Sequence, residues 1–228
     1  PPRSTLFPYT TLFRSVATDG VFSMDGDVAP LRELAAACRE HDAWLFVDDA
    51  HGFGVLGEGR GSVAHFGLAD ERIVYMGTLG KAAGVAGAFV AAHPAVIETL
   101  VQAGRSYIYT TAQPALLACA IQASLAAIRD GHARRARLAR TIERFRAGAA
   151  ALPWTLLPST TPIQPLVVGD AAAAVRLSQA LWDRGIFVPA IRPPTVPQGT
   201  ARLRISFSAA HTDADVDTLL AALGEAAQ

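Results

Sequence analysis

The sequence predicts an α/β fold, with part of a large domain on a mostly parallel sheet and a small α+β domain after it. Short apolar runs alternate with amphipathic helical stretches in the first half of the chain, which is typical of a parallel sheet covered by helices. One run, Trp44–Val47, is continuously apolar, as in strands buried on both faces. The character changes to a basic helix after Gly131, so we expect the large-domain part over residues 16–130 and the small domain over 131–228.

The first fifteen residues, PPRSTLFPYTTLFRS, differ from the rest of the chain in their aromatic and threonine pattern. The stretch TLFPYTTLFRS resembles the translation of a DNA-sequencing adapter, so we exclude residues 1–15 from the fold as non-native. The alternative is a genuine edge strand over Thr10–Phe13, preceded by Pro8. Under the first interpretation the native sequence begins near Val16, and the protein is the C-terminal part of a longer, truncated chain.

The expected elements of the large domain follow in order. A strand over 16–22 ends in a turn rich in Gly and Asp, and a helix then begins at Pro30 and ends near His41. The buried strand over 44–47 is followed by a glycine-rich loop over 52–62. The remaining elements are strands over 72–76 and 85–92 and helices over 94–103 and 113–128, with an aromatic segment at 107–111 between the helices.

The small domain opens with a helix over 133–151 that carries six arginines. We expect these charges to form a solvated face, because apolar residues such as Phe145 lie on another side. Strands are expected over 154–157, 163–168 and 202–208, and helices over 171–184 and 212–226, with Asp170 and Thr212 as N-caps.

Composition narrows the classes of function. Twenty basic and twenty acidic residues give a formal net charge of zero, which offers no electrostatic case for a nucleic-acid or anionic-membrane partner. No apolar stretch is long enough to span a bilayer and no targeting signal is visible, so we expect a cytoplasmic protein. Cys38 and Cys119 lie in helical patterns without nearby His or Cys, which predicts free thiols and no metal site.

Lys81 is the only lysine, and nineteen arginines carry the other basic charges of the side chains. Arginine can replace lysine in most ion pairs but cannot act as an amine nucleophile. Lys81 follows the apolar run Ile73–Met76 and lies among small residues in Gly77–Gly84, which suits an amine approached by a flat ligand. Schiff-base chemistry with a carbonyl cofactor is therefore the leading interpretation; the alternative is that an arginine-rich composition left one lysine by chance.

Asp48, His51 and Thr78 join Lys81 at the ends of two successive predicted strands, where open α/β sheets bind ligands. The combination suits pyridoxal phosphate: the lysine binds the aldehyde, the carboxylate keeps the pyridine nitrogen protonated, and nearby donors hold the phenolic oxygen and the phosphate. Taken singly, each residue has an ordinary explanation, such as a helix cap, a loop histidine or a turn threonine.

From Val16 to its C-terminus the chain resembles the α-oxoamine synthases, which are fold-type I pyridoxal-phosphate enzymes. The resemblance rests on the motifs DGVFSMDGDVAPL, LFVDDAHGFGVLGEGRGS, MGTLGKAAGVAG, YIYTT and AIRPPTVPQGTARLRIS. It implies that Lys81 binds the cofactor covalently and acts as the base at the substrate Cα, that Asp48 pairs with the pyridinium nitrogen, and that His51 and Ser23 contact the ring or its phenolic oxygen.

The same resemblance implies further contacts. Thr78 would bind the phosphate, and Thr110 or Thr111 would reach the phosphate of a neighbouring subunit in a homodimer. Arg204 would hold the amino-acid carboxylate, for which a bidentate guanidinium is well suited, although Arg192 and Arg202 are similar in type and place. Thr195 would line the acyl pocket.

Within the family, the segment from Ala190 to Pro197 favours the biotin-pathway member, which joins L-alanine to a pimeloyl thioester carried by coenzyme A or acyl carrier protein and releases carbon dioxide. Three alternatives stay open: a glycine-using 2-amino-3-ketobutyrate ligase or 5-aminolevulinate synthase, an inactive truncated chain that serves as a dimerisation module, and an unrelated α/β protein. The glycine-aromatic phosphate loop and the ring-stacking histidine of the family's N-terminal half are not in this sequence.

Overall fold

The computed structural model describes residues 14–227, which form two compact units. The first unit comprises the described residues up to Val21 and Val28–Gly131, and the second comprises Phe22–Asp27 and the chain from His132 onward. The segment interpreted as adapter-derived lies outside the described residues except for Arg14 and Ser15, as does the alternative edge strand.

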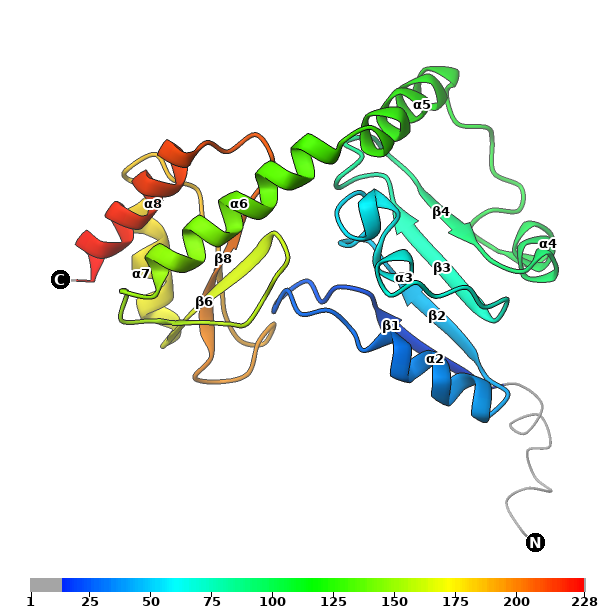
Figure 1. Ribbon diagram of the computed structural model, residues 1–228, viewed down its shortest axis with the longest axis horizontal. Coiled ribbons are helices and arrows are strands. Elements are labelled where there is room, and N and C mark those ends of the chain that lie inside the picture. Colours follow the sequence, from blue (N-terminus) through cyan, green and yellow to red (C-terminus); the bar gives the residue numbers. More distant parts are fainter. Residues whose placement is uncertain (1–13, 228) are drawn as a thin grey trace, which may run out of the picture. The chain divides into compact units, whose positions relative to one another are not determined.

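The first unit is built on a four-stranded sheet in the order β1-β2-β3-β4 (Figure 1). Strands β1 (Ser15–Asp19), β2 (Trp44–Asp48) and β3 (Ile73–Thr78) are parallel, and β4 (Ala88–Ala91) runs antiparallel to β3. The mostly parallel sheet is thereby confirmed. Strand β1 begins one residue before the predicted start and ends three residues before the predicted end.

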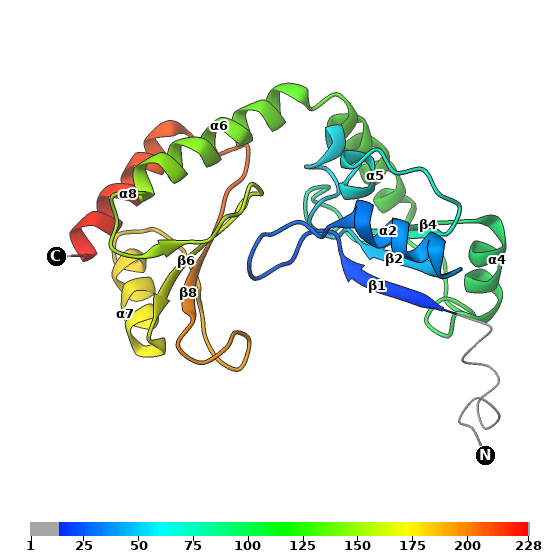
Figure 2. The same cartoon turned by 60° about the horizontal axis from the view of Figure 1, so that its bottom comes forward.

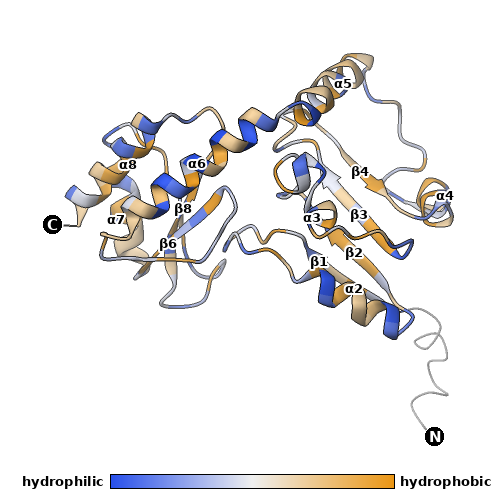
Figure 3. Cartoon of the chain, viewed as in Figure 1, coloured by the Kyte–Doolittle hydropathy of each residue, from blue (hydrophilic) through white to orange (hydrophobic). Residues whose placement is uncertain are grey.

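Helix α2 (Leu31–Glu40) packs on the sheet through one apolar side (Figure 2). Its buried Leu31, Ala35 and Cys38 belong to one cluster with Leu45, Val47 and Ile73 of the strands. The predicted glycine-rich loop contains the 3-10 helix η2 (Gly57–Gly59), and the short helix α3 (Ser62–His65) begins at its end. Helices α4 (Pro94–Ala103) and α5 (Ala115–Arg129) are apolar in composition (Figure 3), yet neither has a buried residue.

The second unit is a separate antiparallel sheet in the order β5-β6-β8-β7, with three helices. Its elements are α6 (His132–Ala149), β5 (Thr155–Leu156), β6 (Ile163–Gly169), α7 (Ala171–Trp182), β7 (Ala190–Ile191), β8 (Ala201–Ser206) and α8 (Asp213–Ala226). The predicted N-caps are confirmed, since Asp170 accepts a hydrogen bond from the Ala173 amide and Thr212 forms a capping box with Asp215.

The arginines of α6 are not all solvated, so that prediction is partly wrong. Arg144 agrees with the prediction, because it forms a bidentate pair with Asp217 on the exposed side of the helix. Arg146 instead turns inward and donates to the carbonyl of Leu157 and to Gln164, whose side chain is fully buried. Nearby, Phe145 is 0% exposed and packs against Phe207 with ring centroids 5.1 Å apart.

In residues 14–227, no helix is both long and apolar enough to cross a membrane.

Candidate active site

Polar side chains gather at the carboxyl edge of the parallel strands in the first unit. Asp48 is the last residue of β2 and Thr78 is the last residue of β3. Asp19, the last residue of β1, is the register partner of Asp48. The carboxyl ends of parallel strands meet at one edge of the sheet, which is where open α/β sheets bind ligands. The structure therefore brings Asp19, Asp48 and Thr78 to the edge that the sequence predicted.

Lys81 lies in the turn that leads from β3 to β4. The turn is closed by hydrogen bonds from the Leu79 amide to the Gly87 carbonyl at 2.8 Å and from the Val85 amide to the Leu79 carbonyl at 2.9 Å. Gly84 in this turn has φ +65°, and a Cβ there would meet no atom within 4 Å, so the space beside the turn is open. Lys81 itself is exposed among the described residues. The amine is held on a closed turn with access for a ligand.

The charge of Lys81 acts on Asp19, at the end of β1. Burial raises the pKa of the Asp19 carboxyl and Asp48 raises it further, whereas Lys81 lowers it. Asp19 thus lies within electrostatic reach of both Asp48 and the Lys81 amine. Thr78 Oγ1 is engaged locally, because it donates to the Gly87 carbonyl and accepts from the Gly80 amide, each at 3.3 Å.

Asp48 and His51 share one short turn after β2. Asp48 Oδ1 accepts from the Ala50 amide at 3.0 Å, and the Asp48 carbonyl accepts from the Gly20 amide at 2.7 Å. His51 is half-buried on the following turn. The main chain around both side chains is therefore fixed by hydrogen bonds within the first unit.

Thr110 and Thr111 are exposed in the segment between α4 and α5. Thr110 Oγ1 donates to the Tyr107 carbonyl at 2.6 Å, and Tyr109 beside it is 96% exposed with φ +65°. This segment presents its side chains outward from the described part of the first unit. Their role at a neighbouring subunit's phosphate stays a prediction.

Two candidate arginines lie on the same face of β8 and differ in their partners. Arg202 is 5% exposed, pairs with the Asp25 carboxylate and donates to the Thr200 carbonyl at 3.0 Å. Arg204 donates to the Ser23 carbonyl at 2.6 Å and to Ser206 Oγ at 3.0 Å, both uncharged groups. Burial lowers the pKa of Arg204. Of these two arginines, Arg204 is the one whose positive charge is not already paired with a carboxylate, because Asp25 pairs with Arg202.

The other predicted substrate contacts also belong to the second unit. Arg192 and Thr195 are exposed, and the Thr195 amide donates to the Arg192 carbonyl at 3.0 Å in one turn. Ser23 lies in the segment Phe22–Asp27, where its carbonyl accepts from Arg204. Ser23, Thr195 and Arg204 are thus members of one unit, while Lys81 and Asp48 are members of the other.

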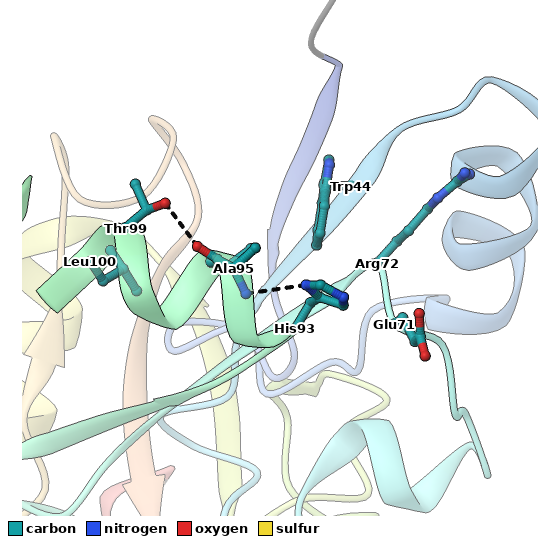
Figure 4. Close-up of a pocket in the computed structure, with 8 residues that line it drawn as sticks. Trp44, Glu71, Arg72, His93, Ala95, Thr99 and Leu100 are labelled. Carbon is teal, nitrogen blue, oxygen red and sulfur yellow. Dashed lines mark hydrogen bonds between the residues drawn. The ribbon is translucent and has the colours of Figure 1, made fainter. Parts of the chain in front are cut away.

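A cavity of about 540 Å³ lies at the opposite end of the first sheet (Figure 4). Trp44 begins β2, Arg72 precedes β3 and His93 follows the antiparallel β4, so the cavity is remote from the strand ends at Asp48 and Thr78. His93 Nδ1 accepts from the Ala95 amide at 3.2 Å and thereby caps α4. None of the predicted site residues is among those that line this cavity.

Within residues 14–227, no group of three or more His, Cys, Asp and Glu side chains is placed to hold a metal ion.

Residues 11–223 match the model of the family described as aminotransferase class I and II. The chain belongs to this family. Among curated relatives, the 8-amino-7-oxononanoate synthase of Dechloromonas aromatica is 63% identical over 96% of this chain and 57% of its own length. The chain thus spans about half the length of the curated relatives it matches.

Two solved structures are similar to this chain in fold. The 8-amino-7-oxononanoate synthase of Francisella tularensis is similar with a TM-score of 0.82 and 32% identity, over 98% of this chain and 66% of that one. A variant serine palmitoyltransferase from S. paucimobilis, solved with a bound PLP–myriocin aldimine, gives a TM-score of 0.86 and 33% identity over 93% of this chain and 54% of that one. These matches confirm the predicted fold type I architecture.

Two carboxylates at this edge of the sheet were not predicted from the sequence. Asp19 ends a strand as Asp48 does, but Ser15 and Thr18 make β1 too polar for its carboxylate to mark the abrupt end of an apolar run. Asp49 is 0% exposed and adjoins Asp48, but two consecutive aspartates give no indication of which side chain is buried. The pleat of the strand decides that, because neighbouring side chains point to opposite faces.

Proposed function

We propose that this chain carries the cofactor and amino-acid site of an 8-amino-7-oxononanoate synthase. The reaction is the PLP-dependent condensation of L-alanine with a pimeloyl thioester of coenzyme A or acyl carrier protein, with loss of carbon dioxide, in biotin biosynthesis. The observation that carries the proposal is the position of the only lysine of the chain at the sheet edge of Asp48. The choice among family members is supported by the names of relatives at 56–63% identity.

The groups at this edge fit PLP chemically. Lys81 offers an exposed primary amine for the aldehyde, and Asp48 offers a carboxylate for the ring nitrogen. The Thr78 hydroxyl would exchange its 3.3 Å bond to the Gly87 carbonyl for a bond to the phosphate. The turn beside Lys81 has open space, since a Cβ at Gly84 would touch nothing and one at Gly80 would find its nearest neighbour at 3.7 Å. Bound PLP would withdraw electrons from the amino-acid Cα, so that this carbon can lose its proton and attack the thioester carbonyl.

The protein side chains then have separate tasks. The Lys81 amine would hold the cofactor through its aldehyde and would also serve as the base for the Cα proton of alanine. Asp48 keeps a proton on the ring nitrogen through its negative charge, and His51 and Ser23 orient the ring. Arg204 binds the alanine carboxylate, with Arg192 as the alternative for that contact, and Thr195 borders the acyl chain.

A homodimer in the cytoplasm is part of the same proposal. Thr110 and Thr111 lie on an exposed segment, as a contact with the phosphate site of a second subunit requires. The two cysteines, Cys38 and Cys119, are both free, which suits a reducing compartment.

The choice of Arg204 predicts a specific defect. Arg204→Lys keeps the positive charge but loses the planar fork, so we expect the KM for L-alanine to rise about 10–100-fold, as for a lost charged hydrogen bond. Arg192→Lys, made as the matched variant on an exposed position, should change this KM less than about threefold. Initial rates at varied alanine concentration measure both. A larger rise for Arg192→Lys would transfer the carboxylate contact to Arg192.

Reductive trapping tests the proposed function. The purified chain is incubated with PLP, reduced with borohydride and digested, and we expect one modified side chain, Lys81, because no other lysine exists. The chain is then supplied with L-alanine or glycine and with pimeloyl, acetyl or succinyl thioesters. An amino-ketone from alanine and the pimeloyl thioester is expected. Product from glycine instead would identify a sister synthase, and the absence of a Lys81 adduct would refute the cofactor assignment.

A further inference from the structure

Asp49 is a buried carboxylate for which the proposed chemistry has no use. It follows Asp48 directly and is 0% exposed in the first unit. Consecutive side chains at the end of a strand point to opposite faces, so the Asp49 side chain is directed to the face of the sheet opposite that of Asp48. A carboxylate in such a place is unfavourable unless its surroundings stabilise it.

The Asp49 side chain connects three segments of the unit. Its Oδ2 accepts from the Ser62 amide at 2.6 Å and from the Tyr75 hydroxyl at 2.9 Å. Tyr75 belongs to β3, and Ser62 is the first residue of α3. An N–H···O distance this short is typical of a charge-assisted bond. The carboxylate therefore fastens the end of β2 to the next strand and to the helix beyond the glycine-rich loop.

The main chain of Asp49 is fixed as firmly as its side chain. Its amide donates to the Met76 carbonyl of β3 at 2.8 Å, and its carbonyl accepts from the amides of Gly52 and Phe53 at 3.1 and 3.0 Å. His51 lies inside the turn that these two bonds close. Asp49 is thus the residue from which the His51 turn begins.

Three glycines enclose the Asp49 carboxylate. A Cβ at Gly20, Gly52 or Gly61 would come closer than 3.0 Å to an Asp49 side-chain atom, which real Cβ atoms do not tolerate. Gly61 also has φ +95°, where a side chain is strained in any case. Gly20 donates its amide to the Asp48 carbonyl at 2.7 Å, so the enclosure is continuous with the backbone of Asp48. The carboxylate has one position available to it.

Burial of the Asp49 carboxylate lowers the free energy of unfolding, so a contribution to stability does not explain why this residue is an aspartate. Among the described residues, no hydrogen bond of good geometry reaches Asp49 Oδ1 or Ser62 Oγ, which both lie beside Gly20. Burial raises the pKa of Asp49, against the opposing effects of the amide and hydroxyl of Ser62 and of the Tyr75 hydroxyl, and the charge of Asp48 raises it further. An apolar residue of similar size would avoid this desolvation. What it could not do is hold β3, α3 and the His51 turn at one point.

We propose that Asp49 is a positioning residue that sets the direction of the Asp48 carboxylate and the place of the His51 imidazole at the cofactor. The inference deepens the proposed function and rests on it for the cofactor. It assigns the second aspartate of the Asp48–Asp49 pair a task separate from that of the first.

The test compares Asp49→Asn with Glu58→Gln, which removes the same charge from an exposed position of the neighbouring loop. The first readout needs no cofactor: hydrogen–deuterium exchange of residues 50–62 should become about tenfold faster in Asp49→Asn and stay unchanged in Glu58→Gln. The second readout is the absorbance of PLP bound at Lys81 against pH, whose midpoint should move by about one unit only in Asp49→Asn.

The outcomes separate the two proposals. Faster exchange with an unchanged absorbance titration would make Asp49 a structural residue only, and unchanged exchange would show that it does not hold the turn; either result overturns the inference. If the parent chain binds no PLP, the proposed function fails, and the exchange comparison still decides whether Asp49 holds the His51 turn. Should Asp49→Asn not fold, Tyr75→Phe removes one donor to Oδ2 while keeping the ring, and the same shifts are expected at smaller size.

Discussion

Lys81→Arg is expected to abolish reductive trapping of PLP on a side chain and to remove turnover. Arginine keeps the positive charge that acts on Asp19, but its guanidinium stays protonated and cannot form the covalent link. Loss of the base alone lowers turnover by about 10²–10⁴-fold. Peptide mass spectrometry after borohydride reduction measures the adduct, and formation of the amino-ketone measures turnover.

A second variant separates position from residue type in that experiment. Arg105→Lys in the Lys81→Arg background restores one lysine at an exposed position of the first unit. We expect it to give no specific adduct, because the closed turn between Leu79 and Gly87 and the neighbouring carboxylates are specific to position 81. If the double variant is modified as efficiently as the parent, the reaction is non-specific labelling and Lys81 has no special role.

The strand ends of the site were predictable because charge interrupts an apolar run abruptly. Trp44–Val47 is followed at once by Asp48, and Ile73–Met76 precedes Thr78 and Lys81 at short range. Parallel order then brings these residues to one edge, as the register of β2 and β3 confirms. The amino-acid composition alone identified Lys81 as a candidate site residue, because a single lysine among twenty arginine and lysine residues stands out without any knowledge of the fold.

The parts that sequence did not predict depend on contacts between distant segments. The difference between Arg202 and Arg204 comes from Asp25, which is 177 residues from Arg202 in the chain. Arg146 is directed inward by Gln164, a residue whose burial no local pattern indicates. Strand β7 has only two residues, too few to show a hydrophobic period. Local periodicity therefore predicts the elements, while tertiary pairing decides which polar side chains stay free for chemistry.

Asp48→Asn is expected to keep the Lys81 adduct and to lower turnover about 10²–10³-fold, the usual size of a lost electrostatic contact in an active site. Asparagine preserves the shape and the acceptor for the Ala50 amide, but it cannot hold a proton on the ring nitrogen by charge. Exchange of the alanine Cα proton for deuterium, followed by NMR, measures the step that depends on that proton.

Asp19→Asn is the matched variant for this prediction, because it makes the same substitution at the register partner of Asp48 on the adjacent strand. Neighbouring strands are about 4.8 Å apart, so only one of the two carboxylates can face the ring nitrogen directly. We expect Asp19→Asn to keep deuterium exchange within about tenfold of the parent, as for a charge that acts from a distance. If Asp19→Asn is the more damaging change, the ring nitrogen pairs with Asp19, and the strand that supplies the electron-withdrawing contact is β1.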